Sequence, residues 1–397
     1  MRRLAATALA LACAATCGVT GAQALVVDTR TPRPEPAPAG HAAWSDEQRP
    51  IDAKDAQMPW VHGGPPGVAA RINDALYLQT IEAVAPRAPG STFTPAPPPH
   101  PSLGYAFCEL HFSVERNDGR VLSIAMQLDW RGSGHCAADS REFHFDAATG
   151  RQLEAADLLT PAGRATLIQQ SRQAAAANYD RLLAALPPDP EDQDADADAD
   201  ADAVAPSQPP PPPPSAPGDP SEDEQRRFFR SCRDAWQEPA ADDALDFDLP
   251  AKGGLEVPSH GCAGNRHELL MDDPPGAFVV PDARLEPLLT PYGRRLLLGE
   301  GSAPAPAGLF GQTLRGRVGT TSITLHLGAP RGRRSDIDSV YAYDRIGTAI
   351  TLYGSVRGDT LELREDADGS GFTLRQVGRA LVGTWHGKGK TLPARLE

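Results

Sequence analysis

The sequence lacks the short motifs that mark the commonest enzyme chemistries. No serine has glycines two residues before and two residues after it, which excludes the nucleophile turn of an α/β-hydrolase. No cysteines show the Cys-x-x-Cys spacing and no histidines the His-x-x-x-His spacing of simple redox and zinc sites. The Gly-Lys-Thr at 389–391 follows Gly383, which is one residue too far away for a phosphate loop. These absences disfavour an enzyme and indicate neither a cofactor nor a metal.

The sequence also has little positive charge to offer a nucleic acid. Its formal net charge is −14, and residues 187–224 contain twelve acidic side chains and no basic one. When this stretch and the two arginines at positions 2 and 3 are set aside, a charge of about −4 remains for the rest of the chain. No basic stripe is present, so we expect no nucleic-acid partner.

Residues 1–24 have the order of an export signal. Arg2 and Arg3 precede an apolar stretch at 4–19, and Ala22-Gln23-Ala24 follows as a small-residue cleavage pattern. The stretch is shorter than the roughly 20 residues that cross a bilayer as a helix. We expect cleavage near Ala24 and a periplasmic or secreted mature chain with no membrane span. An uncleaved anchor, or a lipid anchor on a cysteine of the signal, is the alternative.

Four cysteines follow the signal, and an even number in an exported chain indicates two disulfides. Of the three possible pairings we favour Cys108 with Cys136 and Cys232 with Cys262, because each closes a loop of about 30 residues. By the chain-entropy argument each bond contributes about 3 kcal/mol. A catalytic thiol or a zinc site is the less favoured alternative.

Proline and glycine divide the chain into segments, since it has 40 Pro and 37 Gly. The Asp-Ala repeats and the polyproline at 209–214 cannot form a core, which predicts a disordered insert at 187–220. We predict a signal peptide at 1–24, a disordered tether at 25–57, an α+β domain at 58–300 that contains the insert, a linker at 301–308 and an all-β domain at 309–397.

Local signals place several elements in the α+β domain. Thr160 before Pro161, and Ser221 three residues before Glu224, are N-caps of two helices that flank the insert. Apolar alternation on both sides of Asn-Asp-Gly at 117–119 predicts a β-hairpin. We also expect helices at 67–84 and 281–289 and strands at 245–249 and 255–257.

From residue 309 the sequence consists of short segments in which apolar and polar residues alternate, separated by Gly and Asp. About eight strands in fewer than ninety residues predict an antiparallel meander, closed as a small barrel or strongly curved so that its edges are hidden. The expected strands are 313–318, 322–327, 340–343, 349–353, 360–364, 372–375, 381–385 and 391–396.

The middle region carries an ordered set of landmarks. Residues 128–135 read Leu-Asp-Trp-Arg-Gly-Ser-Gly-His, residues 143–150 read Phe-His-Phe-Asp-Ala-Ala-Thr-Gly, and 157–159 read Asp-Leu-Leu. This order resembles a bacterial extracytoplasmic domain of unknown function. That domain also occurs in the lysozyme-sensing ectodomain of the sigma-V anti-sigma factor and beside the catalytic domain of a peptidoglycan deacetylase. The resemblance covers 60–298 and departs from the family where Gly-Ser-Gly-His replaces Gly-Gly-Ala-His.

The resemblance implies an α+β envelope domain that binds a component of the cell wall or a protein near it. A candidate binding loop comprises Trp130, Gly132, Gly134 and His135. His135 could also serve a hydrolase together with nearby carboxylates, but a histidine that ties a glycine-rich turn to the backbone is the favoured interpretation. Four aromatic residues of the C-terminal domain form a candidate sugar-stacking face, although core packing is commoner for such residues: Tyr341, Tyr343, Tyr353 and Trp385.

Together these features favour a non-catalytic binding protein of the cell envelope. Its expected ligand is peptidoglycan, a muropeptide or a wall-active protein such as lysozyme. The alternatives are a cell-wall hydrolase centred on His135 and an envelope scaffold that acts through the C-terminal domain. The acidic insert is expected to be a solvated spacer rather than a docking site for a basic protein, and the oligomeric state stays open.

Overall fold

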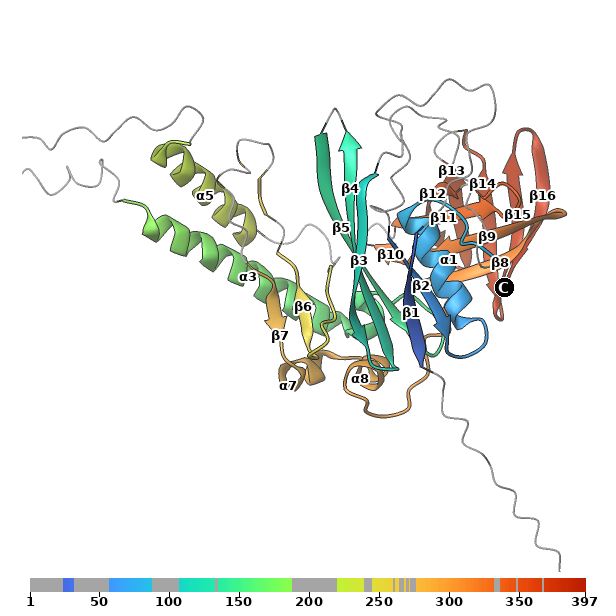
Figure 1. Cartoon of the computed structure of the whole chain (residues 1–397), viewed down its shortest axis with the longest axis horizontal. Helices are drawn as coiled ribbons and strands as arrows, with labels where there is room; N and C mark the ends of the chain where they lie inside the picture. The colour runs from blue at the N-terminus through green and yellow to red at the C-terminus, as the bar shows by residue number, and fades with distance from the viewer. Residues whose placement is uncertain are drawn as a thin grey trace, which may run out of the picture.

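The fold is known from a computed structural model, which places a three-stranded sheet between a helical arm and a C-terminal barrel (Figure 1). It describes residues 24–31, 57–87, 107–132, 135–187, 220–238, 245–259, 261–263, 268, 271, 276–331, 336–347, 349–365 and 368–397. No helix in these ranges is both long enough and apolar enough to cross a membrane. The predicted signal peptide, apart from Ala24, and most of the insert lie outside them.

The first unit begins with a strand where a tether was expected. Strand β1 (Leu25–Arg30) pairs antiparallel with β2 (Met58–Gly63), so the prediction of a tether over 25–57 is wrong for these six residues. Leu25 is buried and Val27 packs against the same core, while Val26 is exposed. The alternation of apolar and polar residues in β1 is too short to be recognised in the sequence. The partner strand β2 begins about thirty residues further along the chain.

Helix α1 (Val68–Thr80) and the sheet β3–β4–β5 complete this unit. The predicted helix and hairpin are confirmed: β3 (Phe107–Asn117) and β4 (Val121–Gly132) flank the Asn-Asp-Gly turn. The third strand, β5 (His135–Asp146), was not predicted. Apolar residues on one face of the sheet form a core with α1 and β2. The opposite face of β5 carries the polar residues at alternate positions that form the site described below.

The part of the chain after β5 contains two copies of one heptapeptide, which bond to each other. The sequence Leu-Leu-Thr-Pro-x-Gly-Arg occurs at 158–164 and at 288–294. Thr160 N donates to Leu288 O at 2.9 Å, and Thr290 N donates to Leu158 O at 2.8 Å. Each threonine also caps the helix that follows it, which confirms the predicted cap of α3 (Pro161–Ala185) and adds α8 (Pro291–Leu297). The two copies therefore bind each other as a pseudo-symmetric pair.

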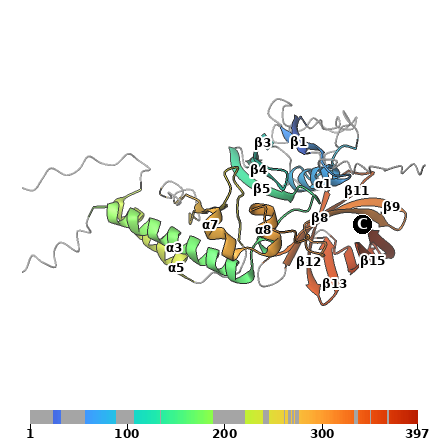
Figure 2. The ribbon, with the colours of Figure 1, turned by 90° about the horizontal axis from the view of Figure 1, so that it is seen from below.

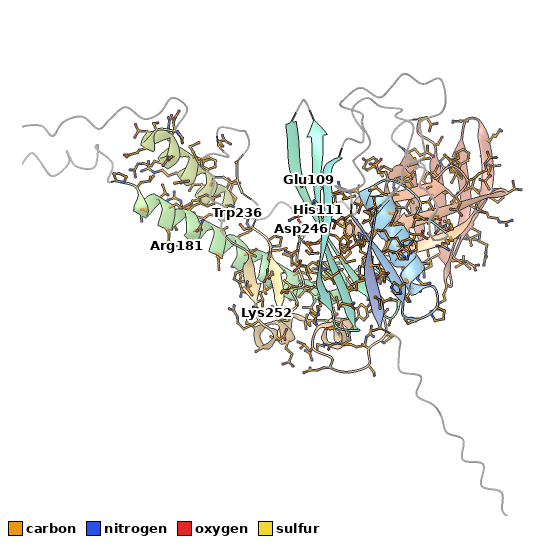
Figure 3. All side chains as sticks on the ribbon, viewed as in Figure 1. Glu109, His111, Arg181, Trp236, Asp246 and Lys252 are labelled. Atoms are coloured by element: carbon orange, nitrogen blue, oxygen red, sulfur yellow. A yellow bond between two sulfur atoms is a disulfide. The ribbon has the colours of Figure 1, made fainter. Side chains whose placement is uncertain are left out.

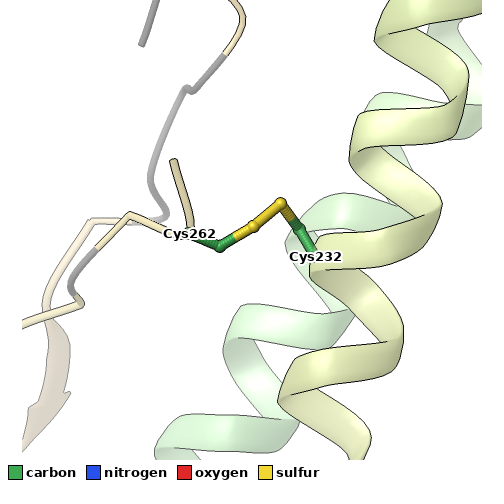
Figure 4. The surroundings of a disulfide bond; sticks show 2 residues. All are labelled: Cys232 and Cys262. Carbon is green, nitrogen blue, oxygen red and sulfur yellow. A yellow bond between two sulfur atoms is a disulfide. The ribbon is translucent and has the colours of Figure 1, made fainter. Parts of the chain in front are cut away.

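Helices α3 and α5 (Glu222–Gln237) lie side by side and form an arm that extends away from the sheet (Figure 2). The capping box predicted at Ser221 and Glu224 is present. The disulfide Cys232–Cys262 ties α5 to the segment at 261–263, with Cα atoms 5.7 Å apart (Figure 4). This pairing is therefore confirmed. The side chains of Cys108 and Cys136 lie outside the described structure, so their bond stays a prediction.

Short elements connect the arm to the barrel. Strand β6 (Leu255–Val257) pairs with β7 (Phe278–Val280), and the helix expected at 281–289 is α7 (Asp282–Leu285) followed by the turn η4 (Glu286–Leu288). A four-residue helix, α2 (Ala155–Leu158), precedes the first heptapeptide threonine. The strand expected at 245–249 is reduced to one bridge, between Asp248 and Glu256.

The C-terminal domain is an antiparallel eight-stranded barrel, and each predicted strand is present. Closure comes from two pairings, β8 with β16 and β9 with β11, which leave no open edge between first and last strands. The two-residue β10 (Pro330–Arg331) adds to β11 outside the ring. The barrel strands are β8 (Gln312–Val318), β9 (Thr321–Leu327), β11 (Asp336–Tyr343), β12 (Ala349–Arg357), β13 (Thr360–Glu365), β14 (Gly371–Val377), β15 (Ala380–Gly387) and β16 (Lys390–Leu396).

The barrel is docked against the first unit. Leu78 and Val84 pack on Val340 and Ala342 of the outer barrel wall. Nearby, Asp74 of α1 has no exposed side-chain surface and receives two arginines, Arg87 and Arg315. Arg315 Nη2 lies 2.6 Å from Asp74 Oδ2. Burial nevertheless raises the pKa of Asp74 above its ordinary value.

The segment expected as a linker, 301–308, has no helix or strand but is not a free tether. Arg151 Nη1 donates to Gly308 O at 2.8 Å, and Ala305 packs on the core around the heptapeptide pair. The segment and the barrel wall therefore both contact the first unit.

Candidate functional site

The candidate site lies on the polar face of the three-stranded sheet. Period-two alternation turns Phe143 and Phe145 of β5 into the core and places Glu142 and His144 on the opposite face. The segment 245–248 packs over this face. His144 Nε2 lies 2.7 Å from Phe247 O, and the two rings stack with centroids 4.8 Å apart.

His144 of β5 connects the sheet to the segment at 245–248 through hydrogen bonds of both ring nitrogens. A carbonyl can only accept, so the contact with Phe247 O fixes the proton on Nε2, and Nδ1 accepts from the Ser123 hydroxyl at 2.7 Å. Burial, with a smaller contribution from Arg116, lowers the pKa of His144 to about 4. The ring is neutral at physiological pH, and both nitrogens are already engaged.

A cavity of about 470 Å³ opens beside this contact, within the size range of small-ligand sites. Its side chains come from α1, β5, the turn after β5 and the segment at 245–258. The polar lining residues are four acids, one base and four neutral groups: Glu142, Glu154, Asp246, Asp248, Arg141, Gln79, Gln152, Ser140 and His144. Figure 3 labels Asp246 beside the sheet, with Glu109 and His111 of β3.

The lining of this cavity contains more acidic than basic residues. Arg141 is the single basic residue of the lining, and its Nη1 donates to Gln79 O at 2.7 Å. The Gln79 amide in turn donates to Gln152 Oε1 at 2.8 Å. Arg141 and Gln79 thus connect β5, α1 and the turn after β5 at the edge of the cavity.

Glu142 is the acid most affected by this environment. Burial, followed by the charges of Asp248 and Glu115, raises the pKa of Glu142 from 4.5 to about 8. Its Oε2 atom is buried and has no hydrogen-bond partner. Glu142 therefore keeps its proton at neutral pH, because burial and the neighbouring negative charges both disfavour its ionised form.

The arrangement is a poor fit for a metal ion. Within the described ranges, Glu142, His144 and Asp248 bring ligand-type atoms to within 4.8 Å of one another. A metal would need a free ring nitrogen, and His144 would have to give up its bond to Phe247 or to Ser123. The remaining donors are two carboxyls, one of which is protonated at neutral pH.

The candidate binding loop lies elsewhere on the same sheet. Gly132 pairs with His135 where β4 and β5 meet, and Trp130 precedes them on β4. The side chains of Trp130 and His135, and all of Gly134, lie outside the described structure. Ser140, at the cavity, is five residues from His135, or about 17 Å along an extended strand. The loop and the cavity are thus different places, and the role of the loop stays a prediction.

Core packing, the interpretation favoured for the four aromatic residues, holds for Tyr341 and Trp385, so these two do not belong to a sugar-stacking face. Tyr341 and Trp385 are buried in the barrel core, and Tyr343 packs against it with its ring 5.4 Å from that of Tyr341. The Tyr341 hydroxyl donates to Glu365 Oε1 at 2.6 Å. Burial, followed by this hydrogen bond, raises the pKa of Tyr341. Tyr353 alone is half exposed. Inward alternation on β11 places Tyr341 and Tyr343 together but turns them into the barrel rather than toward solvent.

No family model matches the sequence, and no curated protein is similar enough to count as a match. The resemblance to the lysozyme-sensing and deacetylase-associated domain therefore stays a prediction.

Proposed function

We propose that the protein is exported and acts as a non-catalytic binding protein of the cell envelope, with its ligand received by the acidic cavity. The observation that carries this proposal is the cavity of about 470 Å³ lined by four acids and one arginine. The predicted signal peptide and the disulfide Cys232–Cys262 support export, because such bonds persist mainly in oxidising compartments.

The form of the cavity supports binding of a polar ligand. The lining offers carboxyl, amide and hydroxyl groups, held in place by the bonds of Arg141 and His144 to backbone carbonyls. Groups that are already oriented before binding lose little conformational entropy when the ligand arrives. A muropeptide, with amides and hydroxyls, offers hydrogen-bond partners to these groups.

The test is co-sedimentation of the mature chain with purified peptidoglycan, alongside retention on immobilised lysozyme at physiological salt. We expect binding to peptidoglycan that weakens at least tenfold in Asp248→Asn. The matched control is Asp338→Asn, which removes the same charge from an exposed position of the barrel. If neither material binds, the proposed function is refuted; if Asp248→Asn binds as tightly as the control, the cavity is not the site.

A second candidate function, hydrolysis of a wall glycan, is favoured by one specific observation. Ligand-type oxygens of Glu142 and Asp248 lie within 4.8 Å, and Glu142 holds a proton at neutral pH. A protonated acid next to a second carboxylate is the arrangement of a retaining glycosidase, whose carboxyls are about 5 Å apart. Release of soluble fragments from labelled peptidoglycan, lost in Glu142→Gln, would support it over pure binding. If the hydrolase instead uses His135, the His135→Ala variant should lose this release of soluble fragments.

A further inference from the structure

We infer that the protein has a further binding site, at the turn between β3 and β4, which takes the carboxylate group of a small organic acid. The site is a cavity of about 430 Å³, within the size range of small-ligand sites. It is bordered by the β3–β4 turn, residues 251–253, the start of α7 and the residues that end and follow α8. It shares no lining residue with the cavity beside His144, so the inference does not depend on the proposed function.

The observation that points to a ligand is an unpaired donor of Arg116. This side chain lines the cavity and is only 5% exposed. Its Nε and Nη2 atoms donate to Asp118 Oδ2 at 3.0 and 2.8 Å, and Nη2 also donates to Leu297 O at 3.2 Å. Nη1 lies at the guanidinium edge away from Asp118, is buried, and has no hydrogen-bond partner among the described residues. A buried charged donor without an acceptor is costly, and an acceptor oxygen in the cavity would remove that cost.

A second basic residue of the lining is also available to a ligand. Lys252, labelled in Figure 3, is exposed, and no hydrogen bond or ion pair joins its ammonium group to any residue of the described ranges. Together with Arg116 Nη1 it gives the cavity two positively charged donors that the protein itself does not use. Donors of this kind form their strongest hydrogen bonds with anionic oxygens.

The third basic residue, Arg120, is held at the wall of the cavity. Its Nη2 donates to Asp118 Oδ2 at 3.2 Å. A Cβ atom added to Gly299 would lie 2.3 Å from Arg120 Nη1, so the guanidinium rests directly on this glycine, whose φ is +76°. The close approach and the left-handed backbone both require glycine at position 299. Arg120 therefore adds positive charge from a fixed position.

The acids of the lining are for the most part engaged by the protein. Asp118 Oδ1 accepts from the backbone N–H groups of Arg120 and Val121, both at 2.9 Å, and Oδ2 accepts from the two arginines. Burial alone would raise the pKa of Asp118, but these hydrogen bonds lower it, so the residue stays ionised. Asp282 Oδ1 accepts from Gly254 N at 2.7 Å. Among these described acids, only Glu300 has a carboxylate without a partner.

This balance favours a carboxylate over a phosphate. Glu300 would repel a doubly charged anion more strongly than a singly charged one. A carboxylate has two oxygens, one for Arg116 Nη1 and one for the ammonium group of Lys252. The cavity is larger than a lone carboxylate, and three apolar residues of its lining would contact the organic part of the ligand: Ala251, Leu297 and Leu298.

The test is isothermal titration calorimetry of the mature full chain with N-acetyl-alanine and with its uncharged C-terminal amide, at pH 7 and low salt. The two probes have nearly the same shape and differ in charge. We expect the acid to bind about tenfold more tightly than the amide, because only the acid offers charged acceptors. Lys252→Gln should weaken binding of the acid about fivefold, and Glu300→Gln should strengthen it about twofold.

Two matched controls remove the same charges from exposed positions of the barrel. Lys390→Gln is the control for Lys252→Gln, and Asp338→Asn is the control for Glu300→Gln. Both should leave the affinity for the acid unchanged, and urea unfolding checks that all four variants are folded. Arg116→Gln is not the variant of choice, because it also breaks the hydrogen bonds to Asp118 and Leu297.

The remaining outcomes each overturn the inference. Equal binding of the acid and the amide, or equal binding of the acid to the wild type and to Lys252→Gln, would exclude a carboxylate at this cavity. Inorganic phosphate that binds more tightly than the acid, and that loses affinity in Lys252→Gln, would replace the carboxylate by a phosphate. Binding of none of the three probes would leave water as the partner of Arg116 Nη1. None of these results bears on peptidoglycan binding, which Asp248→Asn tests separately.

Discussion

Replacing Glu142 by glutamine should stabilise the protein at neutral and alkaline pH, although it removes a potential charge. Burial and the charges of Asp248 and Glu115 raise the pKa of Glu142 from 4.5 to about 8. Between these two pH values the unfolded chain is ionised at this position while the folded chain keeps its proton. The stability of the wild type therefore falls as the pH rises through this interval, and the loss is complete above about pH 8. Glutamine has no proton to lose, so the variant does not show this loss.

The size of the effect follows from the same interval. At about 1.4 kcal/mol per pH unit, the rise from 4.5 to about 8 gives an upper bound of about 5 kcal/mol. Glu142 is only partly buried, so solvent in the cavity screens the interaction. We therefore expect the Glu142→Gln variant to exceed the wild type by about 2 kcal/mol in free energy of unfolding at pH 9, and by nothing measurable at pH 4.5.

The assay is urea unfolding of the mature wild type and of the Glu142→Gln variant at pH 4.5, 6, 7.5 and 9. The variable of interest is the difference between the two proteins at each pH, because titrating groups that do not interact with Glu142 contribute equally to both. Asp338→Asn, which removes a carboxyl from an exposed position of the barrel, serves as the matched control. A difference for Glu142→Gln that is constant across the range, or that favours the wild type at pH 9, would refute the account of the site given above.

Three further changes test the contacts that hold the described parts together. Arg315→Ala removes one of the two arginines that face the buried Asp74 and should lower the free energy of unfolding by about 2 kcal/mol, measured by urea unfolding at pH 7. Cys232→Ser should cost about 3 kcal/mol and speed proteolysis of the helical arm, and a reductant should bring the wild type to the same rate. Gly293→Ala would place a Cβ atom 2.1 Å from a carbonyl oxygen of the other heptapeptide copy and should cost about 3 kcal/mol in thermal unfolding. Gly276→Ala, where no atom lies within 4 Å, should be neutral in the same experiment.

The parts of the fold that the sequence predicts are those with local signals. The strands of the barrel alternate over five or more residues and end at Gly or Asp turns, so each can be recognised without knowledge of its partner. The caps of α3 and α5 are likewise complete within four residues. Strand β1 was missed because its partner follows only after about thirty residues. Strand β5 was missed because its first half has no alternation of apolar and polar residues. This half is a strand because its backbone pairs with β4.

The site was missed for a related reason. Glu142 and Asp248 lie more than 100 residues apart, and the property that marks Glu142 arises only when the segment 245–248 packs over β5. One signal was available: Phe143 and Phe145 turn inward, so Glu142 and His144 must share the opposite face. The repeated heptapeptide was a second signal, since six of seven residues are identical between 158–164 and 288–294, with only the fifth position different. It indicates contact between two distant segments but not the cavity itself.

The two helices of the arm bring the ends of the acidic and polyproline tract to one place. Arg226 of α5 donates to the carbonyl of Pro187, just beyond the end of α3, and the disulfide holds α5 to the segment at 261–263. For a connection whose ends are held together in this way, doubling the number of residues costs only about 0.6 kcal/mol. Adding or removing Asp-Ala units should therefore cost the rest of the molecule little stability.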